Sequence, residues 1–279
     1  VLGVSASAIL VRFSQAPSGV TAAYRLGWTV LLLLPVVLLR CRAELRRVTA
    51  RDLVLCGASG VLLALHFLTW FESLKRTSVA SSTVLVSTEV IFTAMGFALF
   101  LHGKIPRLGV WAILLAFGGS ALLALSGGGG AGELSGNLLA LATASAAAVY
   151  TLIGRIQRGH LSTTVYTFLT YLACFLTLLL GTAAAGTPLT GYGGREWLIG
   201  LALAVLCTLL GHSLFSWCLK YLSPSYVSAA KLCEPVFSSL AAIPLFGEVP
   251  GPLQLAGGAA VLGAVLLYTW AEREKTPAG

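Results

Sequence analysis

Long apolar segments fill this chain, and they constrain its fold more than any other feature. A helix that crosses a bilayer needs roughly 20 consecutive, mainly apolar residues. Ten segments approach or reach that length, and stretches rich in turn-forming or charged residues separate them. They lie at 1–16, 20–39, 53–72, 78–100, 106–126, 134–154, 163–185, 196–219, 224–246 and 252–271. The sequence therefore predicts an all-α, polytopic membrane protein with ten transmembrane helices.

The small number of charged residues excludes a soluble fold. Charged residues make up 10% of the chain, whereas soluble domains carry about 25%. A membrane barrel would instead show short segments of alternating hydrophobicity. The chain begins inside an apolar segment without a basic region before it, so we expect no cleaved signal peptide.

The positions of the basic residues predict the orientation in the membrane. With both termini cytoplasmic, the outside loops hold only Lys75, Arg76 and Arg195. The cytoplasmic segments then hold a larger set, namely Arg40, Arg42, Arg46, Arg47, Arg51, Lys104, Arg107, Arg155, Arg158, Lys220, Arg273 and Lys275. Such a bias is typical of cytoplasmic loops, and it explains the net charge of +8 without a nucleic-acid partner. We expect a multi-pass protein of a bacterial inner (plasma) membrane with both termini in the cytoplasm.

Two segments of the chain repeat one another at a constant offset of 145 residues. Leucine, lysine, serine, glutamate and phenylalanine recur in the same order from Leu74 to Phe92 and from Leu219 to Phe237. The offset spans five predicted helices, which is an odd number, so the second copy would lie upside down relative to the first. Inverted repeats of this kind build many secondary transporters. We expect two five-helix repeats, residues 1–130 and 131–279, around a central cavity.

Three segments carry a resemblance to a known family. They are LHFLTWFESLKRTSVASSTVLVSTEVIF (65–92), SGNLLALATASAAAVYTLIGR (135–155) and SYVSAAKLCEPVFSSLAAIPLFGE (225–248). Together with the ten spans they resemble the EamA family of the drug/metabolite transporter superfamily. The resemblance implies a cavity lined mainly by spans one, three, four, six, eight and nine, with spans five and ten peripheral. Many members carry a proline where this chain has Val90, so the resemblance does not predict a kink there, whereas the second copy keeps Pro235.

Five charged residues lie well inside predicted spans, away from the span ends: Arg12, Arg25, Glu89, Lys231 and Glu234. Charged side chains at membrane depth are costly, so they usually face protein or water and mark function. Lys231 and Glu234 are three residues apart, so they either neutralise each other or leave Lys231 to bind a substrate carboxylate or phosphate. Glu89 either pairs with Arg25 or serves as a protonatable site. We assign Glu89, Glu234, Arg25 and Arg12 to coupling or ion pairing.

Hydroxyl groups beside these charges extend the predicted substrate site. Ser228 shares a helical stripe with Lys231, and Thr83 and Ser87 lie about one turn apart near Glu89. We expect Lys231 to anchor the substrate and the three hydroxyl groups to donate hydrogen bonds to it.

Aromatic and imidazole side chains complete the predicted site. Trp70 lies about one turn from His66, and Trp217 lies about one turn from His212. With Tyr150, the two tryptophans either pack around an organic substrate or belong to the ordinary core or interfacial belt. The two histidines are candidate proton carriers or hydrogen-bond donors.

The motifs indicate transport rather than catalysis. The chain has no HExxH, GxSxG, Walker A or GxGxxG pattern and no cluster of metal ligands, so we expect no enzyme activity, no metal and no cofactor. We expect a secondary transporter of a small polar metabolite, an amino acid being favoured, with a proton-coupled exporter of organic cations or drugs as the alternative. The expected partners are the small-molecule substrate and the lipid bilayer. Small-residue patches at Gly118-Gly119, Gly257-Gly258 and Gly263 predict close helix packing and permit a homodimer.

Overall fold

The computed structural model describes residues 2–100, 105–126, 131–212 and 233–273. Within these residues all regular structure is helical, which confirms the predicted all-α class. The elements are α1 (Leu2–Phe13), α2 (Ser18–Arg40), α3 (Arg42–Leu45), α4 (Ala50–Arg76), α5 (Val79–Val86), α6 (Glu89–Phe100), α7 (Arg107–Ser126), α8 (Ala131–Gln157), α9 (Thr163–Ala184), α10 (Gly194–Ala202), η1 (Leu203–His212), α13 (Cys233–Phe246) and α14 (Pro252–Arg273).

Seven helical segments in the described part of the chain are long and apolar enough to cross a membrane. They are 18–40, 50–76, 79–96, 132–157, 163–184, 194–211 and 252–271. Two shorter apolar segments, 107–123 and 234–246, and the twelve-residue helix α1 lie where the fifth, ninth and first spans are expected. The polytopic membrane character is therefore confirmed.

The fourth predicted span is broken into α5 and α6 although Val90 replaces the proline. At the break, the backbone N–H of Thr88 bonds to Leu85 O at 3.1 Å, one residue closer than in a regular α-helix. The hydroxyl groups of Ser87 and Thr88 donate to Thr83 O (3.0 Å) and Leu85 O (2.6 Å). Such local side-chain bonds compete with the helical ladder and bend it. Two hydroxyl residues thus accompany a break that the family pattern assigns to proline.

The eighth predicted span also departs from a regular α-helix. After α10, residues 203–212 form the π-helical segment η1, in which the Thr208 hydroxyl donates to Leu203 O five residues earlier (3.3 Å). Wide helical turns of this type often occur at functional sites. Here the wider turn accompanies a contact between Thr208 and Arg25 of α2.

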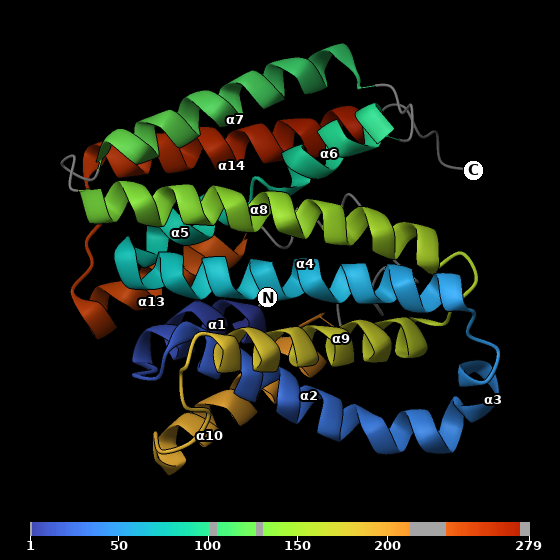
Figure 1. Cartoon of the computed structure of the whole chain (residues 1–279). Helices are drawn as coiled ribbons and strands as arrows, with labels where there is room; N and C mark the ends of the chain where they lie inside the picture. Colours follow the sequence, from blue (N-terminus) through green and yellow to red (C-terminus); the bar gives the residue numbers. More distant parts are fainter. Residues whose placement is uncertain (1, 101–104, 127–130, 213–232, 274–279) are drawn as a thin grey trace.

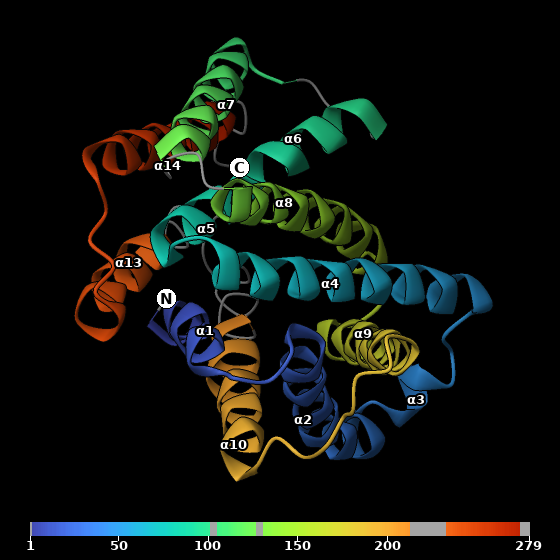
Figure 2. The same cartoon turned by 60° about the vertical axis from the view of Figure 1, so that its left-hand side comes forward.

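The helices form a layered bundle (Figure 1, Figure 2). Helices α7 and α14 pack against each other at one edge, whereas α4 and α8 pack together across the middle. Helix α9 packs against both α2 and α4, and α10 packs against α2, on the opposite side from the α7–α14 pair. The peripheral position expected for spans five and ten is therefore seen.

Two glycines explain the close approach of α7 and α14. A Cβ atom on Gly119 would lie 2.9 Å from Gly257 O, and one on Gly257 would lie 2.9 Å from Gly119 O. Gly118 and Gly263 differ, because a Cβ atom there would meet no described atom within 4 Å. The expectation of close packing is thus confirmed for Gly119 and Gly257 and wrong for Gly118 and Gly263.

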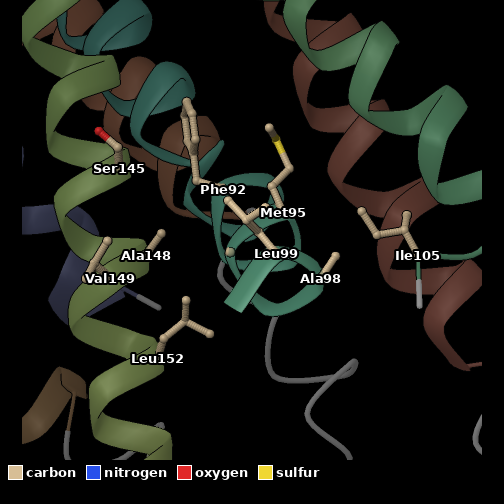
Figure 3. Close-up of a pocket in the computed structure, with 10 residues that line it drawn as sticks. Phe92, Met95, Ala98, Leu99, Ile105, Ser145, Ala148, Val149 and Leu152 are labelled. Carbon is tan, nitrogen blue, oxygen red and sulfur yellow. The ribbon is translucent and has the colours of Figure 1, made fainter. Parts of the chain in front are cut away.

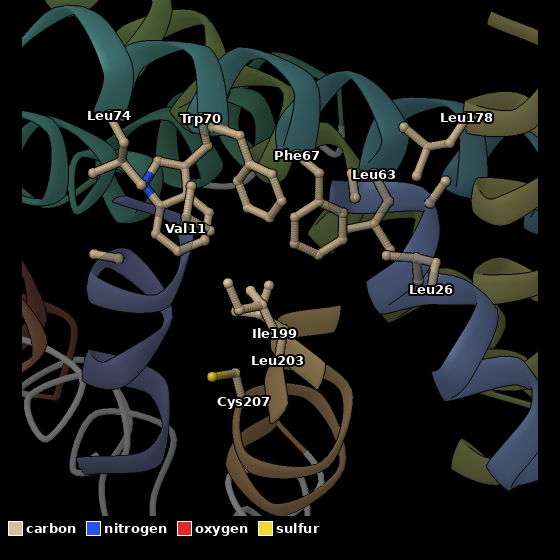
Figure 4. Packing of buried hydrophobic residues seen from close by; sticks show 14 of the residues in the cluster. Val11, Leu26, Leu63, Phe67, Trp70, Leu74, Leu178, Ile199, Leu203 and Cys207 are labelled. Atoms are coloured by element: carbon tan, nitrogen blue, oxygen red, sulfur yellow. The ribbon is translucent and has the colours of Figure 1, made fainter. Parts of the chain in front are cut away.

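The largest apolar core lies between α1, α2, α4, α9 and η1 (Figure 4). Phe67 and Trp70 of α4 are 3% and 5% exposed and point into it. Leu26 of α2, Leu178 of α9 and Leu203 of η1 face them. In a membrane, apolar packing of this kind separates the interior from lipid and positions the few polar groups inside it.

Candidate functional site

Arg25 of α2 is the centre of a polar cluster inside this core. Its side chain is 1% exposed. Its Nε donates to the Thr208 hydroxyl of η1 at 2.9 Å, and its Nη1 donates to the Ser7 hydroxyl of α1 at 3.1 Å. Its Cζ lies 4.4 Å from the centre of the Phe67 ring of α4, a cation–π distance. Four elements thus converge on one guanidinium group.

Glu234 lies in the first turn of α13, close to the same cluster. One turn later, the Ser238 hydroxyl contacts Ser5 O of α1 at 3.2 Å and Glu234 O at 2.8 Å. This contact packs α13 beside the stretch of α1 that carries Ser7. Glu234 is thus carried by a helix that packs against α1, the helix of Ser7.

Glu89 and Arg25 have separate contacts rather than forming the ion pair considered above. Glu89 Oε1 accepts a hydrogen bond of 2.9 Å from the Thr151 hydroxyl of α8, whereas Arg25 contacts α1, α4 and η1. The expected ion pair between Glu89 and Arg25 is therefore wrong for these two described residues. Its physical reason is helix direction, because α6 carries Glu89 toward α8 and away from α2.

The hydroxyl groups predicted on the fourth span bond to their own helix. Thr83 is buried and donates to Val79 O at 2.7 Å, and Ser87 donates to Thr83 O at 3.0 Å. Of the other predicted residues, Ser228, Lys231 and Trp217 lie outside the described residues, as does the side chain of His212.

His66 and Trp70 lie one turn apart on α4, as their spacing predicted, and Tyr150 lies on α8. The rings of His66 and Trp70 are 6.0 Å apart, and His66 Nδ1 lies 3.3 Å from Thr143 O of α8. Trp70 belongs to the core cluster, and Tyr150 packs against that cluster. Within the described part of the chain the indole N–H of Trp70 has no hydrogen-bond partner. A buried donor of this kind is uncommon and fits a residue beside a polar site.

A second cluster, which we call the clasp, consists of Arg12, Leu74, Val79 and Glu248. Arg12 forms an ion pair with Glu248 and donates to Leu74 O at 2.5 Å. The second carboxylate oxygen of Glu248 accepts from the backbone N–H of Val79 at 2.7 Å, at the first turn of α5. The clasp therefore joins the ends of α1, α4 and α5 to the segment that follows α13.

Further polar contacts lie at the same end of the bundle. The Glu196 carboxylate of α10 accepts from the Ser14 hydroxyl at 2.6 Å, and Lys75 donates to Ala16 O at 2.7 Å. At the opposite end, Asp52 of α4 contacts His160 at 2.6 Å and accepts from Gln157 at 3.2 Å. Polar contacts thus close both ends around the apolar core.

Sequence reasoning missed Ser7, Thr208, Glu248 and the Asp52 cluster. Ser7 and Thr208 look like ordinary small residues of an apolar span until Arg25 is placed between them. Glu248 lies in a predicted loop, where a carboxylate is unremarkable. Only Asp52 carried a local signal, because Thr49 and Asp52 have the spacing of a helix capping box, which the structure forms.

An apolar groove between α6 and α8 has a volume of about 540 Å³ (Figure 3). Phe92, Met95 and Leu99 line one side, and Val149 and Leu152 line the other. Among the described residues that line the groove, Ser145 is the one hydroxyl residue and none is charged. We therefore place the candidate site at the Arg25 cluster instead.

The comparison with protein families decides the identity of this bundle. The family described as the EamA-like transporter family matches residues 1–125 and again residues 134–270. The chain belongs to this family. The resemblance seen in the sequence is thus confirmed, and the protein is an EamA-family membrane transporter of the drug/metabolite transporter superfamily.

Curated relatives of this EamA protein include named exporters. The pseudopaline exporter CntI of Pseudomonas aeruginosa (strain UCBPP-PA14) is 23% identical over 74% of this chain and 72% of its own. A probable terminal-alkyne amino-acid exporter of Streptantibioticus cattleyicolor is 27% identical over 80% of this chain and 75% of its own. A solved crystal structure has a TM-score of 0.64 at 19% identity and covers 99% of this chain and 96% of that chain, which shows the fold alone.

Proposed function

We propose that this transporter moves a small polar metabolite, with an amino acid favoured, across the inner membrane by alternating access. The observation that carries the proposal is the buried Arg25 cluster, because a charged, hydroxyl-lined group at membrane depth suits a polar cargo. Two relatives named as exporters of pseudopaline and of an amino acid support export of a related cargo.

The architecture that we propose is two inverted five-helix repeats, 1–130 and 131–279, with ten spans. The two family matches and the paired positions of α7 and α14 support a duplicated design. In this arrangement the clasp closes the outer end and the Asp52 cluster closes the inner end, with both termini cytoplasmic. Opening one end while the other stays closed would expose the site to each side in turn.

In this proposal Lys231 also binds the substrate, with Ser228, Thr83 and Ser87 as hydrogen-bonding groups. Trp70, Trp217 and Tyr150 pack around the substrate, and His66 and His212 donate hydrogen bonds or carry protons. Lys231 comes three residues before Glu234 in the sequence and lies outside the described residues.

Substitution of Lys231 tests the proposed function. Purified protein in liposomes should transport amino acids, and Lys231→Ala should reduce this transport by at least about tenfold, because one charge contact is worth 1.5–3 kcal/mol. Lys231→Arg is the matched control, since it keeps the positive charge and should retain more activity.

Quaternary amines should be poor substrates of the wild-type protein in the same assay. Efficient transport of these cations that survives Lys231→Ala and fails with Glu89→Gln or Glu234→Gln would contradict the proposal. That result would support proton-coupled export of organic cations or drugs. In that alternative, the proton and the organic cation share the carboxylate of the glutamate.

A further inference from the structure

The apolar groove between α6 and α8 opens toward the surrounding membrane (Figure 3). Met95, Leu99 and Val149 line the groove and are still 37%, 72% and 41% exposed. Helix α8 and most of α6 belong to segments that are apolar enough to cross a membrane. Exposed apolar side chains of such segments contact lipid hydrocarbon rather than water. The groove is therefore accessible to the acyl chain of a lipid.

The groove is built into the crossing of the two helices. The first turn of α6 is tied to α8, because Glu89 Oε1 accepts a hydrogen bond of 2.9 Å from the Thr151 hydroxyl. Further along α6, a Cβ atom on Gly96 would lie 2.7 Å from Leu152 Cδ1, so the glycine lets the two helices approach closely. The last turn of α6 then diverges from α8 (Figure 1, Figure 2). The groove thus lies in the wedge between the two helices.

Two exposed arginines lie at one end of this groove. Arg107 is the first residue of α7 and comes two residues after Ile105, which lines the groove. Arg155 is in the last turn of α8 and comes two helical turns after Ala148, which lines the other side. The ends of α6 and α8 and the start of α7 lie at the same end of the bundle (Figure 1). The apolar lining is therefore followed by a positive charge on each side.

We propose that this groove binds one acyl chain of an anionic phospholipid, with the phosphate group of that lipid between Arg107 and Arg155. In the proposed orientation the lipid belongs to the cytoplasmic leaflet. The inference requires only that the chain lies in a membrane. It does not depend on which substrate the protein transports.

The two arginines give the site its selectivity. An acyl chain gains little free energy from leaving other lipid tails for the groove, because both surroundings are apolar. Preference for one lipid must therefore come from the headgroup. Guanidinium groups bind phosphate oxygens through parallel N–H donors, and basic pockets between transmembrane helices bind anionic headgroups. Each arginine should strengthen the binding of an anionic lipid about fivefold. The same charges disfavour a cationic amphiphile.

Two lipids with identical acyl chains test this inference. They are dioleoyl phosphatidylglycerol, which is anionic, and dioleoyl phosphatidylcholine, which carries no net charge. The full chain in detergent is titrated with each lipid, and native mass spectrometry counts the lipids that stay bound. We expect phosphatidylglycerol to bind at least about tenfold more tightly and to raise the unfolding midpoint more, because a ligand of the folded state stabilises it.

Arginine variants test the headgroup half of the site. Arg107→Gln and Arg155→Gln should each weaken phosphatidylglycerol binding about fivefold and leave phosphatidylcholine binding unchanged. Arg158→Gln is the matched control, because Arg158 is also exposed at the end of α8. At roughly 100° per residue it lies about half a turn round the helix from Val149. This variant should bind phosphatidylglycerol as the wild type does.

Filling the groove tests the acyl-chain half of the site. Val149→Trp adds a large side chain to the lining and should weaken the binding of both lipids at least about tenfold. Leu138→Trp is the control, because Leu138 is 58% exposed and lies about three turns earlier on the same helix. It should leave the binding of both lipids unchanged.

Three outcomes would overturn the inference. Equal binding of the two lipids by the wild type would show only unselective lipid contact. A preference for phosphatidylglycerol that survives in the double variant Arg107→Gln and Arg155→Gln would place the headgroup site elsewhere, for example at the basic segment between α2 and α4. Unchanged lipid binding by Val149→Trp would show that the groove is not the site. Loss of the preference in the double variant, together with weaker binding of both lipids by Val149→Trp, supports the inference.

Discussion

Cross-linking α1 to α13 beside the clasp should abolish transport while the protein stays folded. The rings of Phe13 and Phe246 lie 5.1 Å apart, next to the ion pair of Arg12 and Glu248. In a background without the six native cysteines, Phe13→Cys combined with Phe246→Cys and a short bismaleimide should hold that end closed. Alternating access requires the ends to open in turn, so we expect loss of nearly all uptake in liposomes.

The controls for the cross-link use the same reagent. Each single-cysteine variant and the cysteine-free protein should keep their transport rates after treatment with the bismaleimide. A cleavable linker should restore transport once it is cut. Unchanged uptake by fully cross-linked protein would show that α1 and α13 need not separate, and the clasp would then be a static structural contact.

Replacement of Gly60 should cause a larger loss of stability than replacement of Gly57, the other glycine of α4. A Cβ atom at Gly60 would lie 2.5 Å from Ala173 Cβ and 2.7 Å from both Cys174 N and Thr170 O of α9. The backbone of α9 cannot move aside as a flexible side chain can, so α4 and α9 must separate. We expect Gly60→Val to lower the free energy of unfolding by about 3 kcal/mol, measured as a fall in the unfolding midpoint in detergent.

Gly57 provides a matched control on the same helix. A Cβ atom there would meet no described atom within 4 Å, so Gly57→Val adds the same side chain to the same element without the contact. It should change the unfolding midpoint little. Equal effects of the two substitutions would mean that helix propensity, and not the close approach of α9, sets the cost.

The sequence by itself determined the class of the protein and the positions of its helices. Apolar runs of membrane length, with glycine, proline or basic breaks between them, predict helices because a lipid environment requires every backbone group to bond within its own segment. Helices α2, α4, α8, α9 and α14 therefore lie close to where the runs predicted them. The family resemblance followed from ordered motifs in both halves, and the family match confirmed it.

Only the tertiary structure decided which polar residues meet. Ser7 and Thr208 are 201 positions apart in the chain, and no local periodicity connects them, yet both contact Arg25. Arg12 and Glu248 are separated by 236 positions and form the clasp. Hydrophobic periodicity reports which face of a helix is buried but not which helix covers it, because apolar side chains pack without direction. The partners of the buried charges depend on helix crossings, and these exist only once the bundle has assembled.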